Sequence, residues 1–442
     1  MRKSILIILS FSLLLTKGCR SLENNQSEPT KESLVQKFER IYEEAGESYN
    51  QKDFVRYNEI SQQVMEFSPL NLGFLYQYAK SFALVEKEER SLNLLRRIVD
   101  LGGITILSVE TDDDFKSLFE NQDFKNLVES ARDKIHTVNN SEVAYKIKER
   151  DLIPEGVAYD PKTDRLFISS IFRRKIVMIT PDSRIQDFIR EKQDGILGVI
   201  GMEVDPVNRH LWVCSGWDGR AKFLDMERTT DLRTSVYKYD LESAELIKKY
   251  AFNDTTSRFF NDLTIHSNGD VYITDTFTGG VYRISAESDK LELFTEPSVF
   301  LYPNGITLTD DENDLFVAHL AGIHKINLKS REMKKLRHPE DVTLVNIDGL
   351  AFYNNALIAH QGSSLGGVFL YTLNTSQDRV VSRHAVEVLN PLFDFPTTGE
   401  LAGDTYYYIA NAQLRRFDQD GSIFPLDKLD DVYILKVDLR NF

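Results

Sequence analysis

The feature that most constrains the fold is a segment that recurs six times between residues 154 and 411. Each copy begins with a polar residue, often next to glycine, and continues with a short apolar stretch, a turn and a second strand rich in apolar or aromatic residues. The copies begin about 45 to 60 residues apart, which is the length of a four-stranded propeller blade. They are PEGVAYDPKTDRLFISS (154–170), IGMEVDPVNRHLWVCS (200–215), NDLTIHSNGDVYITD (261–275), NGITLTDDENDLFVAH (304–319), DGLAFYNNALIAH (348–360) and GELAGDTYYYIAN (399–411).

A third strand follows every copy, as in KIVMIT and GVYRIS, and a fourth strand follows the first five copies. Four antiparallel strands per repeat predict a mainly β fold, a six-bladed β-propeller over residues 142–442. The sixth copy ends after its third strand, whereas the strand-like stretch EVAYKIKE (142–149) precedes the first copy. We therefore expect this stretch to be the outer strand of blade six, because closing the ring in this way removes exposed strand edges.

The residues before the propeller have a helical period. Over 33–135 the apolar residues recur at helical spacing in three stretches, one of which ends at Gly102-Gly103, a typical helix C-cap. The pattern resembles tetratricopeptide helix pairs. It predicts a small all-α domain that serves packing or binds a protein partner, without chemistry of its own.

The N-terminus predicts export. Arg2 and Lys3 precede an apolar run that is too short to span a bilayer comfortably, which is typical of a secretory signal. The run ends at Thr16-Lys17-Gly18-Cys19, which resembles the lipobox of bacterial lipoproteins. We expect residues 1–19 to be a signal with Cys19 lipidated and 20–32 to be a polar tether, so that the protein is periplasmic or anchored to the outer membrane. An ordinary cleaved signal is the alternative.

Charge and cysteine content exclude some classes of partner. The net charge of −15 argues against nucleic acid, which requires a basic face, and is compatible with binding a cation. The chain has two cysteines, so no disulfide framework is expected. Contact with a membrane is expected only through the lipid anchor. We expect Cys214, which follows an apolar strand, to be an inert and partly buried thiol.

The residues that open each copy would converge on the axis of a propeller, because the innermost strand of each blade lines the central channel. We call these residues the strand heads. Four of the six offer an oxygen ligand, and glycines beside them allow close passage of the backbone. The predicted heads are Glu155, Ile200, Asn261, Asn304, Asp348 and a position near Gly399-Glu400.

Two carboxylates and two amide carbonyls around one axis suit a hard cation such as Ca²⁺, with water completing the coordination. Softer metals prefer histidine or cysteine, which no strand head offers. The sequence therefore predicts one Ca²⁺, or another divalent cation, held by Glu155, Asn261, Asn304 and Asp348.

The heads PEGVAYD, FNDLTIHSNGDVYITD, YPNGITL and IDGLAF are similar to those of the calcium-dependent six-bladed propellers that include gluconolactonase and regucalcin (senescence marker protein). The resemblance covers about residues 145–442 and is more distant for paraoxonases and diisopropylfluorophosphatase. It implies that Glu155, Asn261, Asn304 and Asp348 hold a catalytic calcium, that Asp262 supports its neighbour, and that Asp348 also acts as general base or nucleophile.

The resulting functional prediction is a calcium-dependent hydrolase that opens a lactone or a related small-molecule ester, with a metal-polarised carbonyl and Asp348 as general base. A non-catalytic propeller that binds a partner and holds a structural calcium is one alternative, and a phosphotriesterase is another.

The second strand of each copy runs back toward the metal face, which would place its last residue on the rim. The rim residues predicted in this way are Ser170, Ser215, Asp275, His319, His360 and Asn411. His319 and His360 are candidate proton shuttles, by resemblance to the paraoxonases, although Ile200 replaces the histidine that those enzymes carry at the head of blade two. Asp275 has a second interpretation as a structural turn acceptor.

A long charged insertion, residues 216–234, follows the second strand of blade two and would overhang the mouth of the channel as a lid or a substrate-contacting loop. Its cations could meet an anionic sugar acid or face solvent. They are Arg220, Lys222 and Arg228.

Overall fold

The structure, a computed structural model, describes residues 32–217, 232–418 and 421–442. The predicted signal, nearly all of the predicted tether, and Arg220, Lys222 and Arg228 lie outside the described residues. Among the described helices, none combines the length and apolar character that crossing a bilayer requires.

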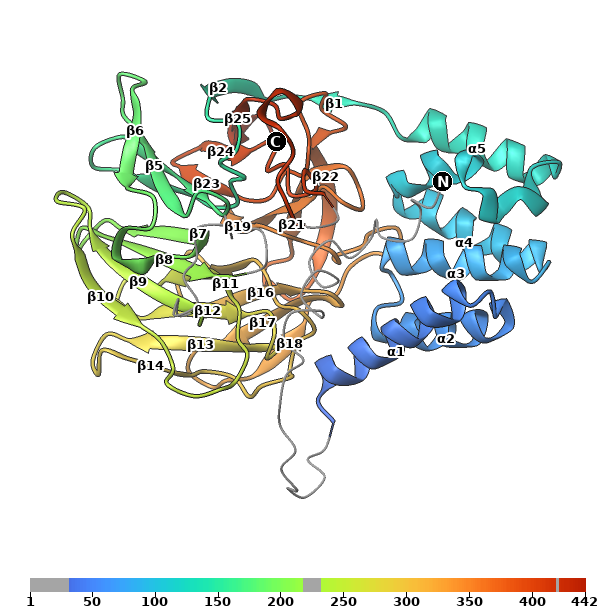
Figure 1. Cartoon of the computed structure of the whole chain (residues 1–442), viewed down its shortest axis with the longest axis horizontal. Helices are drawn as coiled ribbons and strands as arrows, with labels where there is room; N and C mark the ends of the chain where they lie inside the picture. The colour runs from blue at the N-terminus through green and yellow to red at the C-terminus, as the bar shows by residue number, and fades with distance from the viewer. Residues whose placement is uncertain (1–31, 218–231, 419–420) are drawn as a thin grey trace.

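Six antiparallel sheets form the ring of a six-bladed β-propeller (Figure 1). Blades 1 to 4 are continuous in sequence. Blade 1 contains β3 (Val157–Asp160), β4 (Arg165–Ser170), β5 (Lys175–Ile179) and β6 (Ile185–Ile189). Blade 2 contains β7 (Gly198–Asp205), β8 (His210–Gly216), β9 (Ser235–Asp240) and β10 (Leu246–Tyr250). Blade 3 contains β11 (Phe260–Ile265), β12 (Val271–Asp275), β13 (Gly280–Ser285) and β14 (Lys290–Leu293). Blade 4 contains β15 (Ile306–Leu308), β16 (Asp314–His319), β17 (Gly322–Asn327) and β18 (Met333–Lys335).

The last two blades take strands from the segment that precedes blade 1. Blade 5 contains β19 (Leu350–Tyr353), β20 (Ala356–Gln361), β21 (Gly367–Leu373) and β22 (Val380–Val388), and β1 (Val138–Asn139) adds a fifth strand to its outer edge. Blade 6 contains β23 (Gly399–Ala402), β24 (Thr405–Ile409) and β25 (Val432–Asp438), with β2 (Glu142–Ile147) as its outer strand. The predicted ring closure is confirmed: β2 pairs with β25 in antiparallel register, with Glu142 opposite Lys436 and Ile147 opposite Val432.

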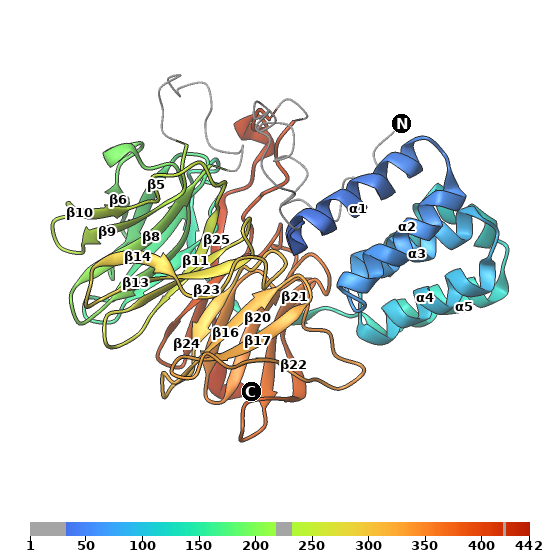
Figure 2. The ribbon, with the colours of Figure 1, turned by 90° about the horizontal axis from the view of Figure 1, so that it is seen from below.

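The helical segment lies against one side of the ring (Figures 1 and 2). It contains α1 (Leu34–Asn50), α2 (Phe54–Phe67), α3 (Leu72–Leu84), α4 (Glu88–Leu101) and α5 (Gln122–Lys134), with the 3-10 helices η1 (Ile104–Thr111) and η2 (Asp113–Leu118) between the last two. Further 3-10 turns are η3 (Gln193–Gly195), η5 (Leu426–Lys428) and η6 (Leu439–Asn441). Local signals define several helix ends: Ser33 begins α1 with a capping box, and Gly102 ends α4 with a φ of 80°.

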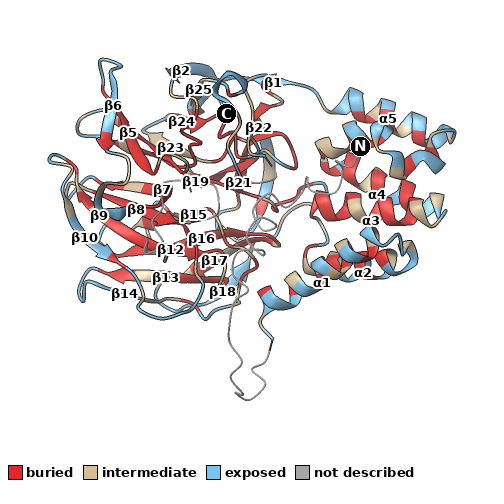
Figure 3. Cartoon of the chain, viewed as in Figure 1, coloured by how far each residue is buried: buried red, intermediate tan, exposed pale blue. Residues whose placement is uncertain are grey.

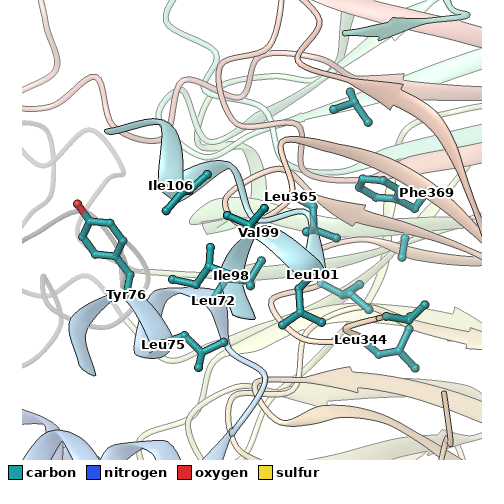
Figure 4. Close-up of a cluster of buried hydrophobic side chains, with 14 of the residues drawn as sticks. Leu72, Leu75, Tyr76, Ile98, Val99, Leu101, Ile106, Leu344, Leu365 and Phe369 are labelled. Atoms are coloured by element: carbon teal, nitrogen blue, oxygen red, sulfur yellow. The ribbon is translucent and has the colours of Figure 1, made fainter. Parts of the chain in front are cut away.

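The helical segment and the propeller share one hydrophobic core. A single cluster of buried side chains includes Leu72, Leu75 and Leu101 from the helices together with Leu344 and Phe369 from the side of blade 5 (Figure 4). Figure 3 shows the same arrangement: α3 is buried along most of its length, whereas the outer helices remain partly exposed. The helices are therefore packed onto the blades rather than tethered to them.

Candidate metal centre

The strand heads form a closed ring of contacts around the axis. A Cβ atom added at Gly156 would lie 2.1 Å from the carbonyl oxygen of Ile200, so the heads of blades 1 and 2 approach as closely as glycine permits. Gly305 has the same relation to the carbonyl oxygen of Asp348, at 2.6 Å. The heads of blades 2 and 3, and those of blades 5 and 6, meet in the same way through Gly201 and Gly349.

Two hydroxyl groups complete the ring where no glycine is present. The Thr274 hydroxyl of blade 3 donates a hydrogen bond to the carbonyl oxygen of Asn304, at 2.8 Å. The Thr398 hydroxyl of blade 6 donates to the carbonyl oxygen of Glu155, at 2.6 Å. The backbones that carry the four candidate ligands are thus linked, blade to blade, around one hub.

Three of the candidate ligand side chains, Glu155, Asn261 and Asp348, are buried at this hub, and Asn304 is half-buried. The amide nitrogen Nδ2 of Asn304 donates to Oδ1 of Asp348 at 2.6 Å, so these two side chains are in direct contact. Nδ2 of Asn261 donates to the Thr276 hydroxyl at 3.0 Å. Glu155 is 1% exposed and Asp348 is 8% exposed.

This donor set fits a hard cation. Both amides use their nitrogen in a hydrogen bond, which leaves the carbonyl oxygen as the atom that a cation would take, beside the carboxylates of Glu155 and Asp348. Within the described residues, no cluster of three or more His, Cys, Asp and Glu side chains is suited to a metal. A site at this hub therefore depends on the two asparagines, and oxygen donors of this kind are those of Ca²⁺.

Asp262 lies on the channel side of the ring. Its Oδ1 accepts the backbone N–H of Leu263 at 2.9 Å, and the carboxylate lines a polar cavity of about 110 Å³ along the axis. Burial and, to a smaller degree, the charge of Asp348 raise the pKa of the Asp262 carboxyl to about 7.

Two further carboxylates line the same cavity, and sequence reasoning missed both as functional residues. Glu203 and Glu400 each lie three residues after the head that the structure gives their blade, Ile200 and Thr397. The error in the predicted head of blade 6 concealed this shared spacing. Burial raises the pKa of Glu400 to about 8, with a smaller contribution from Asp262. Burial, and then the charge of Glu400, raises the pKa of Glu203.

Glu400 predicts a pH-dependent stability. Its pKa rises from 4.5 to about 8 on folding, so the folded state retains a proton that the unfolded state loses, and the free energy of unfolding falls as pH rises across this interval. Glu400→Gln keeps an acceptor for Leu401 but removes the titration. With a chelator present, we expect the variant to be more stable than wild type by about 1–3 kcal/mol at pH 8 and equally stable at pH 4. Urea unfolding at both pH values measures this, and equal stability at pH 8 would contradict it.

The head of blade 6 differs from the prediction. The backbone N–H of Ile409 donates to Thr398, as His360 does to Gly349 in blade 5, so the head is Thr397-Thr398 and not Gly399-Glu400. Neither threonine resembles the polar-glycine pattern of the other copies, which explains the error of two residues.

Among the predicted rim residues, Ser170, Ser215 and Asn411 are buried, and each side chain bonds the backbone of a neighbouring segment. The Ser170 hydroxyl donates to the carbonyl oxygen of Leu152, and that of Ser215 accepts the N–H of Leu197 at 2.9 Å. Asn411 bonds the backbone of Asp431 and Tyr433. These side chains therefore bond their own neighbouring segments, and their contact with substrate stays a prediction.

Asp275 is also buried, and its turn-acceptor interpretation agrees with the structure. Its carboxylate accepts the N–H groups of Phe259 at 2.8 Å and Phe277 at 3.1 Å, together with the Thr278 hydroxyl. Burial raises the pKa of the Asp275 carboxyl. Cys214 is fully buried, deeper than the partial burial predicted for it, and burial raises the pKa of its thiol, which agrees with an inert residue.

Both histidines have a hydrogen-bond partner at Nε2, and their role as proton shuttles stays a prediction. Nε2 of His319 lies 2.8 Å from Nδ1 of His324, and Nδ1 of His319 accepts the N–H of Ala321. His360 is fully buried, and its Nε2 lies 2.9 Å from the hydroxyl of Tyr406 in blade 6. Burial lowers the pKa of both His319 and His360 to about 3, so both rings are neutral at physiological pH.

Fold and site together define a six-bladed propeller with an oxygen-donor centre on its axis. Residues 153–358 match the family described as SMP-30/Gluconolactonase/LRE-like region. The match contains the candidate ligands Glu155, Asn261, Asn304 and Asp348. Part of the propeller is therefore similar to this family, which the strand heads also resemble. Among curated proteins, none matches the chain.

Several solved structures match part of this chain at low sequence identity. A gluconolactonase from Xanthomonas campestris is 14% identical, with a TM-score of 0.45, and the match covers 67% of this chain and 95% of that one. A luciferin-regenerating enzyme is 14% identical, with a TM-score of 0.46 over 68% of this chain and 95% of that one. Virginiamycin B lyase from Staphylococcus aureus is 17% identical, with a TM-score of 0.41 over 60% of this chain and 80% of that one.

Proposed function

We propose that this protein is a calcium-dependent hydrolase that opens a lactone or a related ester. The observation that carries the proposal is the closed ring of strand heads, which brings two carboxylates and two amides to one hub and sets Asn304 and Asp348 in contact at 2.6 Å. The SMP-30/gluconolactonase/LRE-like region over the same residues supports it.

In this proposal Glu155, Asn261, Asn304 and Asp348 hold the cation through oxygen atoms. A bound calcium ion supplies a Lewis acid that polarises the substrate carbonyl and stabilises the negative charge that develops on its oxygen. Asn304 orients Asp348 by donating a hydrogen bond to Oδ1.

Asp348 is the proposed general base. It accepts a proton from the attacking water, which forms a bond to the carbonyl carbon, and the ring oxygen then leaves and takes a proton to become the hydroxyl of the hydroxy acid. The proposal assigns no step to either histidine, because Nε2 of each already has a hydrogen-bond partner, His324 or Tyr406. In the full proposal the enzyme works outside the cytoplasm, with Cys19 as its lipid anchor.

Hydrolysis of a small substrate panel tests this proposal. An aldonolactone, an aryl ester and a phosphotriester are each measured before chelation, after chelation and after Ca²⁺ is restored. We expect the lactone to be hydrolysed fastest, the rate to fall by about 100-fold or more with chelator, and calcium to restore it.

The other outcomes separate the alternatives. Hydrolysis that is indifferent to the chelator would refute the metal mechanism. A protein that binds calcium and hydrolyses nothing would be a binding module, and a preference for the phosphotriester would identify a phosphotriesterase.

A further inference from the structure

Four strand heads share an unusual backbone conformation two residues upstream. Residues with positive φ and a side chain occur there in blades 1, 4, 5 and 6, and we call them the kink residues. They are Ile153 at 48°, Tyr302 at 49°, Asn346 at 53° and Phe395 at 67°. Positive φ is uncommon for any residue other than glycine, and for bulky or β-branched side chains it is an outlier that the surroundings must enforce. Three of the four also precede a proline, which further restricts the backbone.

The kink residues set the direction in which the backbone enters the hub. In blades 1, 4 and 5 the residue two positions later is Glu155, Asn304 or Asp348, three of the four candidate ligands. A change in backbone direction at the kink would displace the ligand that follows, because only one residue separates them.

Residues of the helical segment contact two of the kink residues, Tyr302 and Asn346, which belong to the adjacent blades 4 and 5. The Tyr302 hydroxyl donates to Oε1 of Glu39 in α1 at 3.0 Å, and the Tyr302 ring packs edge-on against Phe38 with centroids 5.8 Å apart. Leu301 and Tyr302 belong to the same apolar cluster as Val35 and Phe38 of α1. Figure 2 shows α1 extending toward the blades at this side of the ring.

The second kink is held by the connection between α2 and α3. Nδ2 of Asn71 donates to Oδ1 of Asn346 at 2.9 Å, while Oδ1 of Asn71 caps α3. The Thr343 hydroxyl donates to the carbonyl oxygen of Leu70 at 3.0 Å, which fixes the start of the same loop. The kinks of blades 1 and 6 show a different pattern: the carbonyl oxygens of Ile153 and Phe395 accept from Ile171 and Ala412 of their own blades.

We propose that the helical segment is a brace for the metal centre, and that Tyr302, Asn71 and Asn346 are positioning residues for Asn304 and Asp348. The inference rests on the proposed function, since it assumes that these two side chains hold a cation. It assigns the helices a role in the propeller's own chemistry, in place of a separate partner-binding module.

Calcium affinity of the full chain tests the brace. The brace variant Tyr302→Phe/Asn71→Ser removes the hydrogen bond from Tyr302 to Glu39 and both hydrogen bonds between Asn71 and Asn346. It keeps the ring that packs on Phe38, and it retains an N-cap for α3 because serine caps well. The control variant Arg97→Ala/Arg383→Ala removes two hydrogen bonds between helices and propeller, in which Arg97 donates to the carbonyl oxygen of Glu340 and Arg383 donates to that of Leu101. Neither bond involves a kink or a ligand.

Isothermal titration with Ca²⁺ is the readout, and thermal unfolding with chelator measures stability separately. We expect the brace variant to bind Ca²⁺ about tenfold more weakly than wild type, as for other residues that orient metal ligands, and the control variant to bind within about twofold. Equal binding by the brace variant, or equal weakening in the control variant, would overturn the brace while leaving the proposed function intact. A wild-type protein that binds no calcium would overturn both.

Discussion

If the proposed mechanism holds, we expect Asp348→Asn to lower the rate constant of lactone hydrolysis by about 10³-fold, the typical contribution of a positioned general base. Asparagine has the same shape, keeps an oxygen for a cation and can still accept the hydrogen bond from Nδ2 of Asn304. It cannot take a proton from water. The fold should therefore survive while catalysis is lost, and steady-state kinetics with circular dichroism measures both.

The matched control for this prediction is Asp205→Asn. Asp205 is also buried, but its carboxylate accepts the N–H groups of Val207 and Asn208 in the turn after β7, and asparagine can make the same turn. We expect this variant to keep wild-type activity within about twofold. An Asp348→Asn enzyme that is fully active would exclude Asp348 as the base.

Lys80→Ala lowers the free energy of unfolding by about 3–5 kcal/mol, because it leaves carboxylates without their partner in a buried site. Lys80 is 1% exposed, and its Nζ lies 2.8 Å from Asp112 and 3.1 Å from Asp114. The rings of Tyr49 and Tyr76 lie within 6 Å of the same ammonium group, at 5.9 Å and 5.6 Å. Chemical denaturation of the full chain measures the loss.

Two further variants test whether the loss of unfolding free energy comes from uncompensated charge. Lys80→Met with Asp112→Asn and Asp114→Asn removes all three charges and should recover much of the stability, since neutral groups can replace a buried ion cluster. Arg40→Ala breaks an exposed pair with Glu32, in which Arg40 is 55% exposed, and should change stability by less than about 1 kcal/mol. A Lys80→Ala protein as stable as Arg40→Ala would contradict the interpretation.

Local pattern predicted most of the fold. Alternation of apolar residues located the strands of all six blades, helical spacing located α2, α3 and α4, and the count of strands predicted that β2 closes the ring. These features depend on residues close in sequence or on the need to cover strand edges. The short β1, which extends blade 5, has no such signal in its two residues.

The sequence predicted the candidate ligands but not the side-chain contacts around them. The four ligand residues follow one repeated position, and repetition shows which side chains share a level on the axis. The hydrogen-bond partners of the rim residues and histidines carry no such signal: Ser170 bonds the carbonyl oxygen of Leu152, and His360 meets Tyr406 of the next blade, 46 positions away.

The role of the helices depends on contacts between still more distant residues. Asn71 meets Asn346 across 275 positions, and neither residue carries a local pattern that reveals the partner. The same is true of the shared core, in which Leu72 and Leu344 belong to one cluster. Repeats and periodicity describe each part of the chain, whereas the attachment of one part to another is set by tertiary packing.

A crystal structure of the full chain grown with Ca²⁺ tests the central claim most directly. We predict one ion on the propeller axis, coordinated by oxygen atoms of Glu155, Asn261, Asn304 and Asp348 with water completing the shell. Anomalous scattering identifies the metal. A hub that contains only solvent under saturating calcium, or an ion bound by other residues, would contradict the account.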